Sequence, residues 1–206
     1  MKTVYDAKIL GLPKIEDPRG NLSIIEQMKQ IPFEIKRTYW IYDVPGGKDR
    51  GGHAYKENEE FIVALSGSFD VELDDGKNKQ KFSLNRSYHG LYVPKGMWRT
   101  MTNFSTNSLA LVLSSTEYDE NDYIMDYEEF KRWTKDNAIQ TVSSDARTSV
   151  KVNKVDSQGM LKEGKSVFDC SLCELNKMHD PEGNLTYMYE NVHVPFPINR
   201  VFYSYD

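Results

Sequence analysis

The chain has 206 residues, of which 39% are hydrophobic, and a formal net charge of −5. This size and composition allow one ordinary folded domain with a smaller addition, or two small domains, and they argue against disorder throughout. Charges of both signs are mixed along the chain, MKTVYDAKIL lacks the apolar core of a signal peptide, and no stretch approaches the ~20 apolar residues of a membrane span. We therefore expect a cytoplasmic protein that binds neither nucleic acid nor membranes.

Residues 20–115 consist of short apolar runs separated by turn residues, which is the pattern of an all-β domain. Within this region EFIVAL, SFDVEL and KQKFSL are expected to be strands joined by consecutive hairpins. Ser66-Gly67 and Asp75-Gly76 supply turn residues that tolerate a positive φ, as such hairpins require.

A change of period follows the β region. In ENDYIMDYEEFKRWTKDN the residues Ile124, Tyr127, Phe130 and Trp133 recur at every third position, which predicts one helix that closes the domain with an aromatic face. Residues 138–165 are polar with little periodicity and are expected to be a linker.

The two cysteines, Cys170 and Cys173, form a single C-x-x-C in VFDCSLCEL. This stretch is typical of a strand, in which positions i and i+3 point to opposite faces. We therefore favour packing for both cysteines over a metal or redox site. Two cysteines also give no disulfide framework.

The end of the chain repeats its beginning. Residues 12–43 (LPKIEDPRGNLSIIEQMKQIPFEIKRTYWIYD) align without a gap with residues 175–206 (LNKMHDPEGNLTYMYENVHVPFPINRVFYSYD), at a shift of 163 positions. The shared letters include Asp17/Asp180, Pro18/Pro181, Gly20/Gly183, Asn21/Asn184, Leu22/Leu185, Pro32/Pro195, Phe33/Phe196, Arg37/Arg200 and Asp43/Asp206. We expect one complete domain at 1–137 and the opening strands of a second copy at 166–206.

Three β segments cannot bury a core by themselves. We expect the partial copy to pair with the edge of a neighbouring sheet or with a partner subunit. The alternative is that the sequence is part of a longer protein with two complete domains.

The stretches GKDRGGHAYKENEEFIVALSG and YVPKGMWRTMTN resemble the two motifs of the cupin family of small β-barrels. The positions that fit are Gly47, His53, Glu60 and Gly67 in the first motif and Pro94, Gly96 and Asn103 in the second. Tyr55 and Arg99 stand where the family has further histidines. The resemblance implies an all-β cupin jelly-roll barrel, here with a short C-terminal helix and an additional partial β repeat.

The two departures bear on metal binding. A divalent metal in such a barrel would use three histidines and a carboxylate. This chain keeps only His53 and Glu60, and Arg99 would place a permanent cation where the metal should sit. We expect no metal and no other cofactor, and the oxygenase and metal-hydrolase interpretations fall with the metal.

About the first 135 residues resemble the sugar-nucleotide 3,4-ketoisomerases, on DPRGNLSIIE, IKRTYWIYDVP, RGGHAYKENEEFIVALSGSFDVELDDG, HGLYVPKGMW and STEYDENDYI. That family moves a ketone from C4 to C3 of a dTDP-linked 4-keto-6-deoxyglucose. Its R-G-x-H-A-H-K motif implies that His53 is the base and that Tyr55 replaces the histidine that relays protons. The resemblance also implies a homodimer with exchanged N-terminal strands, an exchange that the partial repeat could imitate.

The residues themselves allow this chemistry. A neutral imidazole, with a pKa near ~6.5, can take and return a carbon-bound proton at neutral pH. His53 and Tyr55 lie two positions apart on a predicted strand, so both should project into the barrel interior. Tyr55 would then be a proton donor or a partner for the enediolate oxygen. The alternative for Tyr55 is a core tyrosine with a satisfied hydroxyl.

The nucleotide half of such a substrate needs cations and aromatic surfaces. Arginine and lysine hold phosphates well. The predicted substrate-binding residues are Arg50, Lys56, Arg99, Tyr39, Tyr42, Glu60, Tyr92 and Trp98. Each could instead be ordinary barrel filling or solvated surface.

The sequence therefore predicts an isomerase on a dTDP-linked keto-deoxy sugar, with His53 and Tyr55 as the catalytic pair. One alternative is a 3,5-epimerase of the same fold, which would use a histidine with a tyrosine acid. Another is a non-catalytic module that binds nucleotide sugars, since two family histidines are missing.

Overall fold

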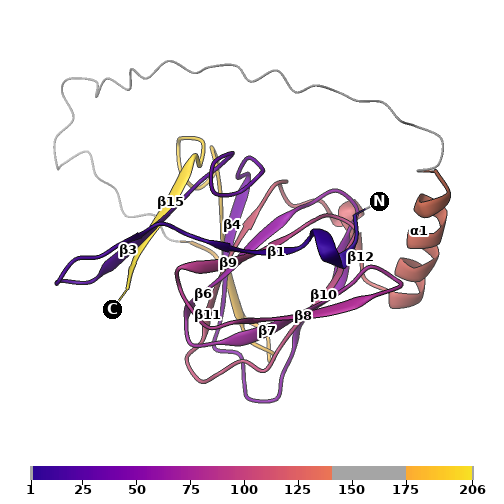
Figure 1. Cartoon of the computed structure of the whole chain (residues 1–206), viewed down its shortest axis with the longest axis horizontal. Coiled ribbons are helices and arrows are strands. Elements are labelled where there is room, and N and C mark those ends of the chain that lie inside the picture. The colour runs from indigo at the N-terminus through magenta and orange to yellow at the C-terminus, as the bar shows by residue number, and fades with distance from the viewer. Residues whose placement is uncertain (1, 141–174, 206) are drawn as a thin grey trace.

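The computed structural model of the chain describes residues 2–140 and 175–205. Within these residues the strands form three antiparallel sheets, and one α-helix packs beside them (Figure 1). Two short 3-10 turns, η1 (Val4–Asp6) and η2 (Glu120–Asp122), complete the described elements. The all-β barrel predicted from the sequence is confirmed.

The largest sheet has seven described strands in the order β1-β9-β6-β11-β4-β14-β13. They are β1 (Lys8–Gly11), β9 (His89–Val93), β6 (Glu60–Ser66), β11 (Leu109–Ser114), β4 (Arg37–Tyr42), β14 (Asn184–Tyr189) and β13 (Lys177–Met178). The facing sheet runs β12-β5-β10-β7-β8. Its strands are β12 (Tyr123–Ile124), β5 (Arg50–Tyr55), β10 (Trp98–Thr102), β7 (Phe69–Asp74) and β8 (Lys79–Leu84).

The third sheet lies outside the barrel and runs β15-β3-β2. It consists of β15 (Arg200–Tyr205), β3 (Asn21–Glu26) and β2 (Lys14–Ile15). In Figure 1 the yellow C-terminal strand β15 lies along the indigo N-terminal strand β3. The C-terminal strands thus pair with strands from the beginning of the chain, and β14 extends the edge of the large sheet at β4. The expectation that the partial copy would pair with a sheet edge is confirmed.

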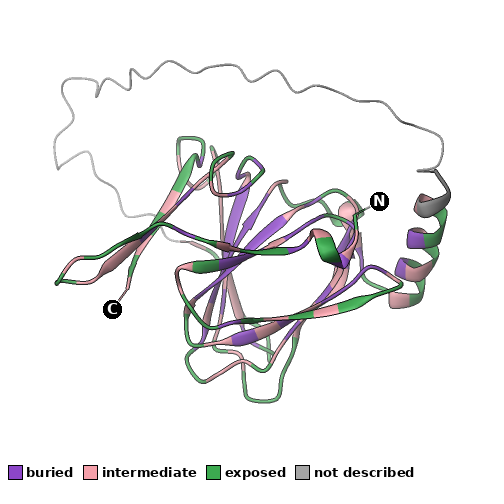
Figure 2. Ribbon diagram, viewed as in Figure 1, coloured by how far each residue is buried: buried purple, intermediate pink, exposed green. Residues whose placement is uncertain are grey.

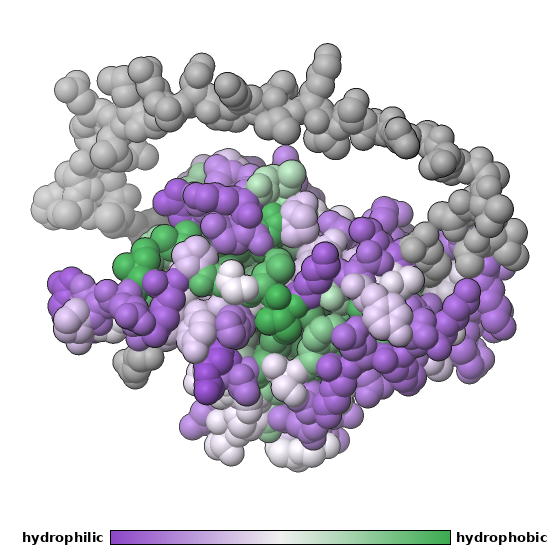
Figure 3. All heavy atoms as spheres, in the orientation of Figure 1, coloured by the Kyte–Doolittle hydropathy of each residue, from purple (hydrophilic) through white to green (hydrophobic). Residues whose placement is uncertain are grey.

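The central strands of the large sheet are apolar on both faces because both faces are covered. Ile62 and Val112 belong to the core between the two barrel sheets. Phe61 and Leu111, their neighbours in sequence, belong to a second core under the N-terminal segment and the three-stranded sheet. Successive residues of a strand point to opposite faces, so a doubly covered strand reads as a continuous apolar run. Figure 2 shows this concentration of buried residues on the central strands, and Figure 3 shows apolar residues between the outer sheet and the barrel.

Of the two predicted hairpins, one is confirmed and one is wrong. β7 and β8 form the expected hairpin around Gly76. β6 does not pair with β7, because the turn at Gly67 carries the chain from one sheet to the other. Gly67 has a φ of +66°, and a Cβ there would lie 2.5 Å from the Ser105 side chain and 2.9 Å from the Ser108 backbone. The turn therefore needs a glycine for a crossover between sheets rather than for a hairpin.

The predicted helix begins later than its apolar period suggested. α1 spans Tyr127–Gln140, and the residues before it form η2 and β12, so Ile124 lies in a strand. The Asp126 side chain accepts a hydrogen bond of 2.7 Å from the Glu129 backbone and starts the helix there. Phe130 is fully buried against the barrel, with its ring 5.6 Å from that of Trp98.

Some sequence predictions fall outside the described residues. α1 continues to Gln140, three residues into the range predicted to be a linker, and the rest of that range, 141–165, is not described. The strand expected around Cys170 and Cys173 also lies outside the described residues. None of the described residues forms a helix long and apolar enough to cross a membrane.

Candidate active site

A cavity of about 560 Å³ opens between the two barrel sheets. Strands β4 and β14 supply one side of its lining, and β5, β10 and β12 supply the other. A volume of this size is typical of small-molecule sites. The expectation that His53 and Tyr55 both project into the barrel interior is confirmed, because both line this cavity.

Two glycines direct His53 into the cavity. His53 lies opposite Arg99 in the pairing of β5 with β10, whereas Gly51 lies opposite Thr100, so Gly52 is an extra residue that bulges the strand. Gly51 has a φ of +92°, and a Cβ there would lie 2.8 Å from the Arg99 carbonyl oxygen. A bulge of this kind redirects the following side chain, and only glycine fits this one.

The imidazole of His53 is held in its uncharged form. Burial, followed by the positive charge of Arg99, lowers the pKa of His53 to about 2, although a hydrogen bond to the Gly51 backbone acts in the opposite direction. Its Nε2 is buried and has no hydrogen-bond partner among the described residues. A neutral imidazole that donates through Nδ1 to a backbone carbonyl keeps the lone pair of Nε2 free. His53 therefore presents an available base to the cavity.

A pair of phenols lies beside this base. The Tyr55 hydroxyl donates a hydrogen bond of 3.1 Å to the Tyr123 hydroxyl, and their rings are 4.6 Å apart. Both rings lie about 5 Å from the His53 ring, at 5.0 and 5.1 Å. Burial raises the pKa of Tyr55 well above its usual value, so this phenol stays protonated and able to donate. Sequence reasoning missed Tyr123, although it falls in STEYDENDYI, one of the stretches that resemble the ketoisomerase family.

Arg99 is paired inside the barrel. Its Nε contacts the Glu60 carboxylate, and its Nη2 donates to Glu60 at 3.2 Å and to the Tyr39 hydroxyl at 2.9 Å. The Tyr39 hydroxyl in turn donates to Glu60 at 2.7 Å. Burial disfavours the Arg99 charge, but Glu60, Tyr39 and Tyr55 together outweigh burial and raise the pKa of Arg99 well above its usual value. The guanidinium is therefore tied to a carboxylate and does not reach out for a phosphate.

This pairing also occupies the carboxylate of the cupin motif. Glu60 accepts hydrogen bonds from Tyr39 and Arg99 rather than facing His53 as a second ligand. No group of three or more histidine, cysteine or carboxylate side chains comes together as a metal site within residues 2–140 and 175–205.

Sequence reasoning missed a second buried arginine. Arg37 is 4% exposed and lines the cavity, with its guanidinium 5.5 Å from the ring centre of Tyr39 and 5.8 Å from that of Tyr118. Its Nε has no hydrogen-bond partner among the described residues, and its Nη2 makes one long contact of 3.4 Å with Ser114. The alternation of side chains along a strand could have identified Arg37, because it lies two positions before Tyr39 and so shares its face.

The C-terminal strands contribute to the same cavity. Leu185, Tyr187 and Tyr189 of β14 line it together with Met178 and Glu182. Arg50, one of the predicted binding residues, also lines it, and its Nη1 lies 3.3 Å from a carboxylate oxygen of Asp180. No local sequence pattern connected these residues with His53.

Five predicted binding residues lie outside the cavity lining: Tyr42, Lys56, Glu60, Tyr92 and Trp98. Tyr42 is on the other face of β4 and contacts Thr186, while the Lys56 ammonium donates to the Asn121 carbonyl. The Tyr92 hydroxyl donates to Glu59, and Trp98 packs on the rings of α1. The structure thus brings together Arg50, Arg99 and Tyr39 around His53 and Tyr55, with Glu60 behind them.

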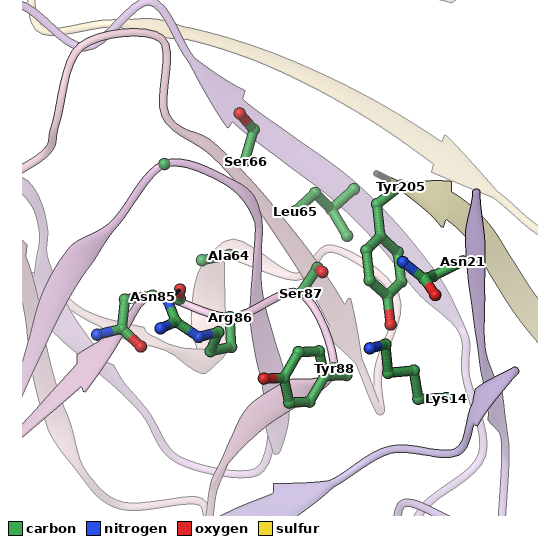
Figure 4. Close-up of a pocket in the computed structure, with 11 residues that line it drawn as sticks. Lys14, Asn21, Ala64, Leu65, Ser66, Asn85, Arg86, Ser87, Tyr88 and Tyr205 are labelled. Carbon is green, nitrogen blue, oxygen red and sulfur yellow. Dashed lines mark hydrogen bonds between the residues drawn. The ribbon is translucent and has the colours of Figure 1, made fainter. Parts of the chain in front are cut away.

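A second, smaller cavity has a different character. It measures about 210 Å³ and lies where the outer sheet meets the barrel, with Lys14, Tyr88 and Tyr205 around it (Figure 4). None of the described residues that line it is a histidine or a carboxylate. It therefore lacks the histidine and carboxylate groups that most often act as bases, and the larger cavity is the better candidate active site.

A β-barrel cavity that presents an uncharged imidazole, protonated phenols and buried guanidinium groups defines a class of protein: a cupin-type enzyme that moves protons on a bound small molecule. Comparison with known proteins gives the family. The model named FdtA (WxcM-like, C-terminal) matches residues 5–135 and 168–206, and the chain belongs to this family.

Three relatives illustrate the match. The chain is 45% identical over 126 residues to the TDP-4-oxo-6-deoxy-alpha-D-glucose-3,4-oxoisomerase of Aneurinibacillus thermoaerophilus, covering 61% of this chain and 91% of that protein. A 3,4-ketoisomerase structure from Helicobacter canadensis is 47% identical with a TM-score of 0.62, covering 63% of this chain and 98% of the other. A sugar 3,4-ketoisomerase from Thermoanaerobacterium thermosaccharolyticum, solved in complex with TDP, is 34% identical with a TM-score of 0.63, covering 65% and 98%. Each match takes in nearly all of the relative but less than two thirds of this chain.

Proposed function

We propose that this chain shifts the ketone of a TDP-linked 4-keto-6-deoxyhexose between C4 and C3, with His53 as the base that moves the carbon-bound proton. The predicted class of enzyme, a TDP-sugar 3,4-ketoisomerase, is confirmed in preference to the epimerase, because the three relatives carry that activity in their names. The residue roles are our proposal. They rest above all on the buried, unpartnered Nε2 of His53 inside the cavity.

The reaction needs a base and an acid but no oxidant. His53 Nε2 takes the proton from C3 while the C4 carbonyl oxygen gains a proton, which gives an enediol. The O3 hydroxyl then loses its proton as the C3 carbonyl forms, and C4 receives a proton from the imidazolium. Every bond broken at one carbon is matched by one formed at the other, so the sugar is isomerised without net redox change. Because the imidazole is neutral before it acts, it can accept the carbon-bound proton in the first step.

The phenols serve the oxygen atoms. Tyr55 stays protonated through burial and lies beside His53, so it can donate to the oxygen that becomes negative as C3 loses its proton. Tyr123 accepts from Tyr55, and its own hydroxyl proton offers a second donor or a route for exchange. This pair would take the place of the relay histidine that the resemblance to the ketoisomerase family implies at position 55.

Two cations favour an anionic substrate. Arg37 is buried in the cavity lining with an unused Nε, and Arg50 lines it nearer the C-terminal strands. Guanidinium groups bind phosphate oxygens in a fork geometry, which suits the diphosphate of a nucleotide sugar. The relative solved with TDP supports this class of ligand. We assign Arg37 and Arg50 to substrate binding and Arg99 to holding Tyr39 and Glu60 in place.

The cytoplasmic location and the homodimer with exchanged strands stay predictions. Exchanged strands can come from a second chain or from a repeat within one chain, and the two arrangements differ in mass and in which residues line the site.

The test uses TDP-4-keto-6-deoxyglucose in deuterated buffer, followed by NMR. We expect deuterium at C4 of the product and at C3 of recovered substrate for the wild-type protein, and no exchange for His53→Asn. His89→Asn, which removes an exposed histidine of β9, is the matched control and should exchange as the wild type does. Deuterium at C5 would indicate an epimerase instead.

A binding measurement distinguishes the isomerase from a non-catalytic binding module. If wild-type protein binds the nucleotide sugar but exchanges no carbon-bound proton, the chain is a binding module and the catalytic role of His53 is wrong. Melting temperatures of His53→Asn and wild type should agree within a few degrees, since a cavity residue contributes little to the core.

A further inference from the structure

The C-terminal repeat (residues 175–206) reproduces the local structure of residues 12–43 in its described part. Gly20 and Gly183 both have a φ of +129°, and each backbone NH bonds to the carbonyl three residues earlier, Asp17 and Asp180. The isolated bridges Gln27↔Ile31 and Glu190↔Val194 are also related by the shift of 163. The two segments are copies in conformation as well as in sequence.

The copies pair reciprocally. β4 of the first copy pairs with β14, which is the counterpart of β3, and β3 pairs with β15, which is the counterpart of β4. The registers agree as well: Tyr42 faces Asn184 and Tyr205 faces Asn21. Mutual contact of equivalent elements is the signature of a twofold, isologous interface between identical units. The repeat therefore occupies the place that the N-terminal strands of a second molecule would take in a strand exchange.

The exchange completes the candidate active site. Leu185, Tyr187 and Tyr189 line the same cavity as His53 and Arg37. The Tyr189 phenol also interacts with the Arg37 guanidinium, which acts to lower the pKa of Tyr189, although burial dominates and raises it. Without β14 the cavity would lose these three side chains from its lining.

Polar contacts and packing fix the repeat to the barrel. Asn184 donates to the Asp43 carboxylate at 2.8 Å, and Lys36 pairs with Glu190 at 3.0 Å. Ile198 is 4% exposed in the second core. A Cβ at Gly183 would lie 2.8 Å from the Val44 side chain, so the backbone fits closely at that point.

The two copies would line the cavity differently. The first-copy counterparts of Tyr187 and Tyr189 are Ile24 and Glu26, as the shift of 163 shows. A site built from the β3 of another chain would therefore present an aliphatic and an acidic side chain. In this structure β3 is already paired with β15, and β14 presents two phenols instead.

We propose that the C-terminal repeat replaces the exchanged strands of a second copy and supplies, in cis, substrate-contacting residues to the active site of the barrel. This proposal rests on the proposed function for the identity of the substrate. The chain between Gln140 and Leu175 is long enough for such a return, because it could extend on the order of 100 Å, compared with a diameter of about 40 Å for a globule of this size. The aromatic side chains of β14 offer stacking surfaces for the nucleotide sugar.

Substitution at equivalent positions tests which copy lines the site. Leu185 lines the cavity and Leu22 is its first-copy counterpart, so Leu185→Trp and Leu22→Trp are the same change in the two copies. Each is placed in a His53→Asn background, which we expect to bind without turnover, and titrated calorimetrically with TDP-4-keto-6-deoxyglucose. We expect at least tenfold weaker binding for Leu185→Trp and less than a twofold change for Leu22→Trp. The reverse result, or no change in either, overturns the proposal.

Two further variants guard against a folding defect. If Leu185→Trp does not fold, Tyr187→Ala and Ile24→Ala repeat the comparison with smaller side chains. If His53→Asn binds no nucleotide sugar and wild type turns none over, the proposed function fails. The next experiment still decides whether the repeat acts in cis or in trans. It measures any enzymatic activity that the chain has or, if there is none, its molecular mass.

Complementation distinguishes a repeat supplied in cis from one supplied in trans. Full chains carrying His53→Asn and Leu185→Trp are co-expressed, so that an intermolecular exchange would join an intact barrel with an intact repeat. Exchange in trans would restore about a quarter of wild-type activity by random pairing, whereas a repeat acting in cis restores none beyond the separate variants. Light scattering should give 23.9 kDa for the wild type. Restored activity overturns the proposal. If no activity can be measured, the proposal is overturned by a wild-type dimer that dissociates when the pairing of β14 is disrupted.

Discussion

His53 offers the sharpest test of the proposed chemistry, because its neutral state makes the folding stability depend on pH. Burial and the neighbouring guanidinium of Arg99 lower its pKa to about 2 in the folded protein, whereas an unfolded chain has the ordinary value near ~6.5. As pH falls below about 6.5, the unfolded chain takes up a proton that the folded protein does not, so folding stability is lost as pH falls. Replacing His53 by asparagine removes this loss.

The magnitude follows from the width of the pH interval. Each pH unit below about 6.5 costs about 1.4 kcal/mol while the folded imidazole stays neutral, so the interval down to pH 5 costs about 2 kcal/mol. We expect the free energy of unfolding of His53→Asn, relative to wild type, to increase by about 2 kcal/mol between pH 7 and pH 5. Urea denaturation followed by tryptophan fluorescence measures it at both values.

The control is His89→Asn, which removes an exposed histidine from β9 and reports any general effect of losing a histidine. If His53→Asn and wild type lose the same stability between pH 7 and pH 5, the folded protein protonates His53 in that interval. The argument for a base held neutral by burial would then be refuted.

Three further predictions concern the neighbours of His53. Tyr55→Phe should lower kcat at least tenfold with KM nearly unchanged, and Tyr123→Phe should lower it less; an equal loss in both would contradict the assignment of Tyr55 as the donor nearest the sugar oxygens. Arg99→Met should reduce the free energy of unfolding by about 3–5 kcal/mol, because it leaves the buried carboxylate of Glu60 unpaired, and adding Glu60→Leu should recover most of that loss in urea titrations. Additive losses would show that the two groups are not coupled. Arg37→Gln should raise KM for the nucleotide sugar at least tenfold with little change in Tm, and an unchanged KM would exclude Arg37 from substrate binding.

The local pattern of the sequence determined which side chains of β5 share a face. His53 and Tyr55 are two positions apart on a strand, and the alternation of side chains places both on one face whatever the partner strands are. The cupin-like spacing predicted a second strand of the site, β10. On this strand Arg99 faces inward, and its neighbour Trp98 faces α1. These assignments depend on short-range periodicity, which a sequence shows directly.

The inward face of β4 could not be chosen in the same way. Alternation separates Tyr39 from Tyr42, but it does not say which set of side chains faces the cavity. The partner strands decided it: packing against β11 and β14 turned Arg37, Tyr39 and Ile41 toward His53 and left Tyr42 outside.

The order of the strands within the sheets was also decided by the tertiary structure. The residues that flank Gly67 are compatible with a hairpin, yet β6 pairs with β9 and β11, which lie far away in the sequence. In a barrel built from two facing sheets most strand partners are distant, and a turn residue specifies only the local backbone.

The sequence by itself determined that the chain carries a repeat of its own opening segment and a histidine strand suited to proton transfer. Only the tertiary structure decided that β14 of the repeat lies on β4, so that Tyr187 and Tyr189 face the same cavity as His53. The physical reason is that the backbone hydrogen bonds of a sheet are alike for every sequence. Which edges meet is therefore set by the burial of apolar faces across the whole molecule.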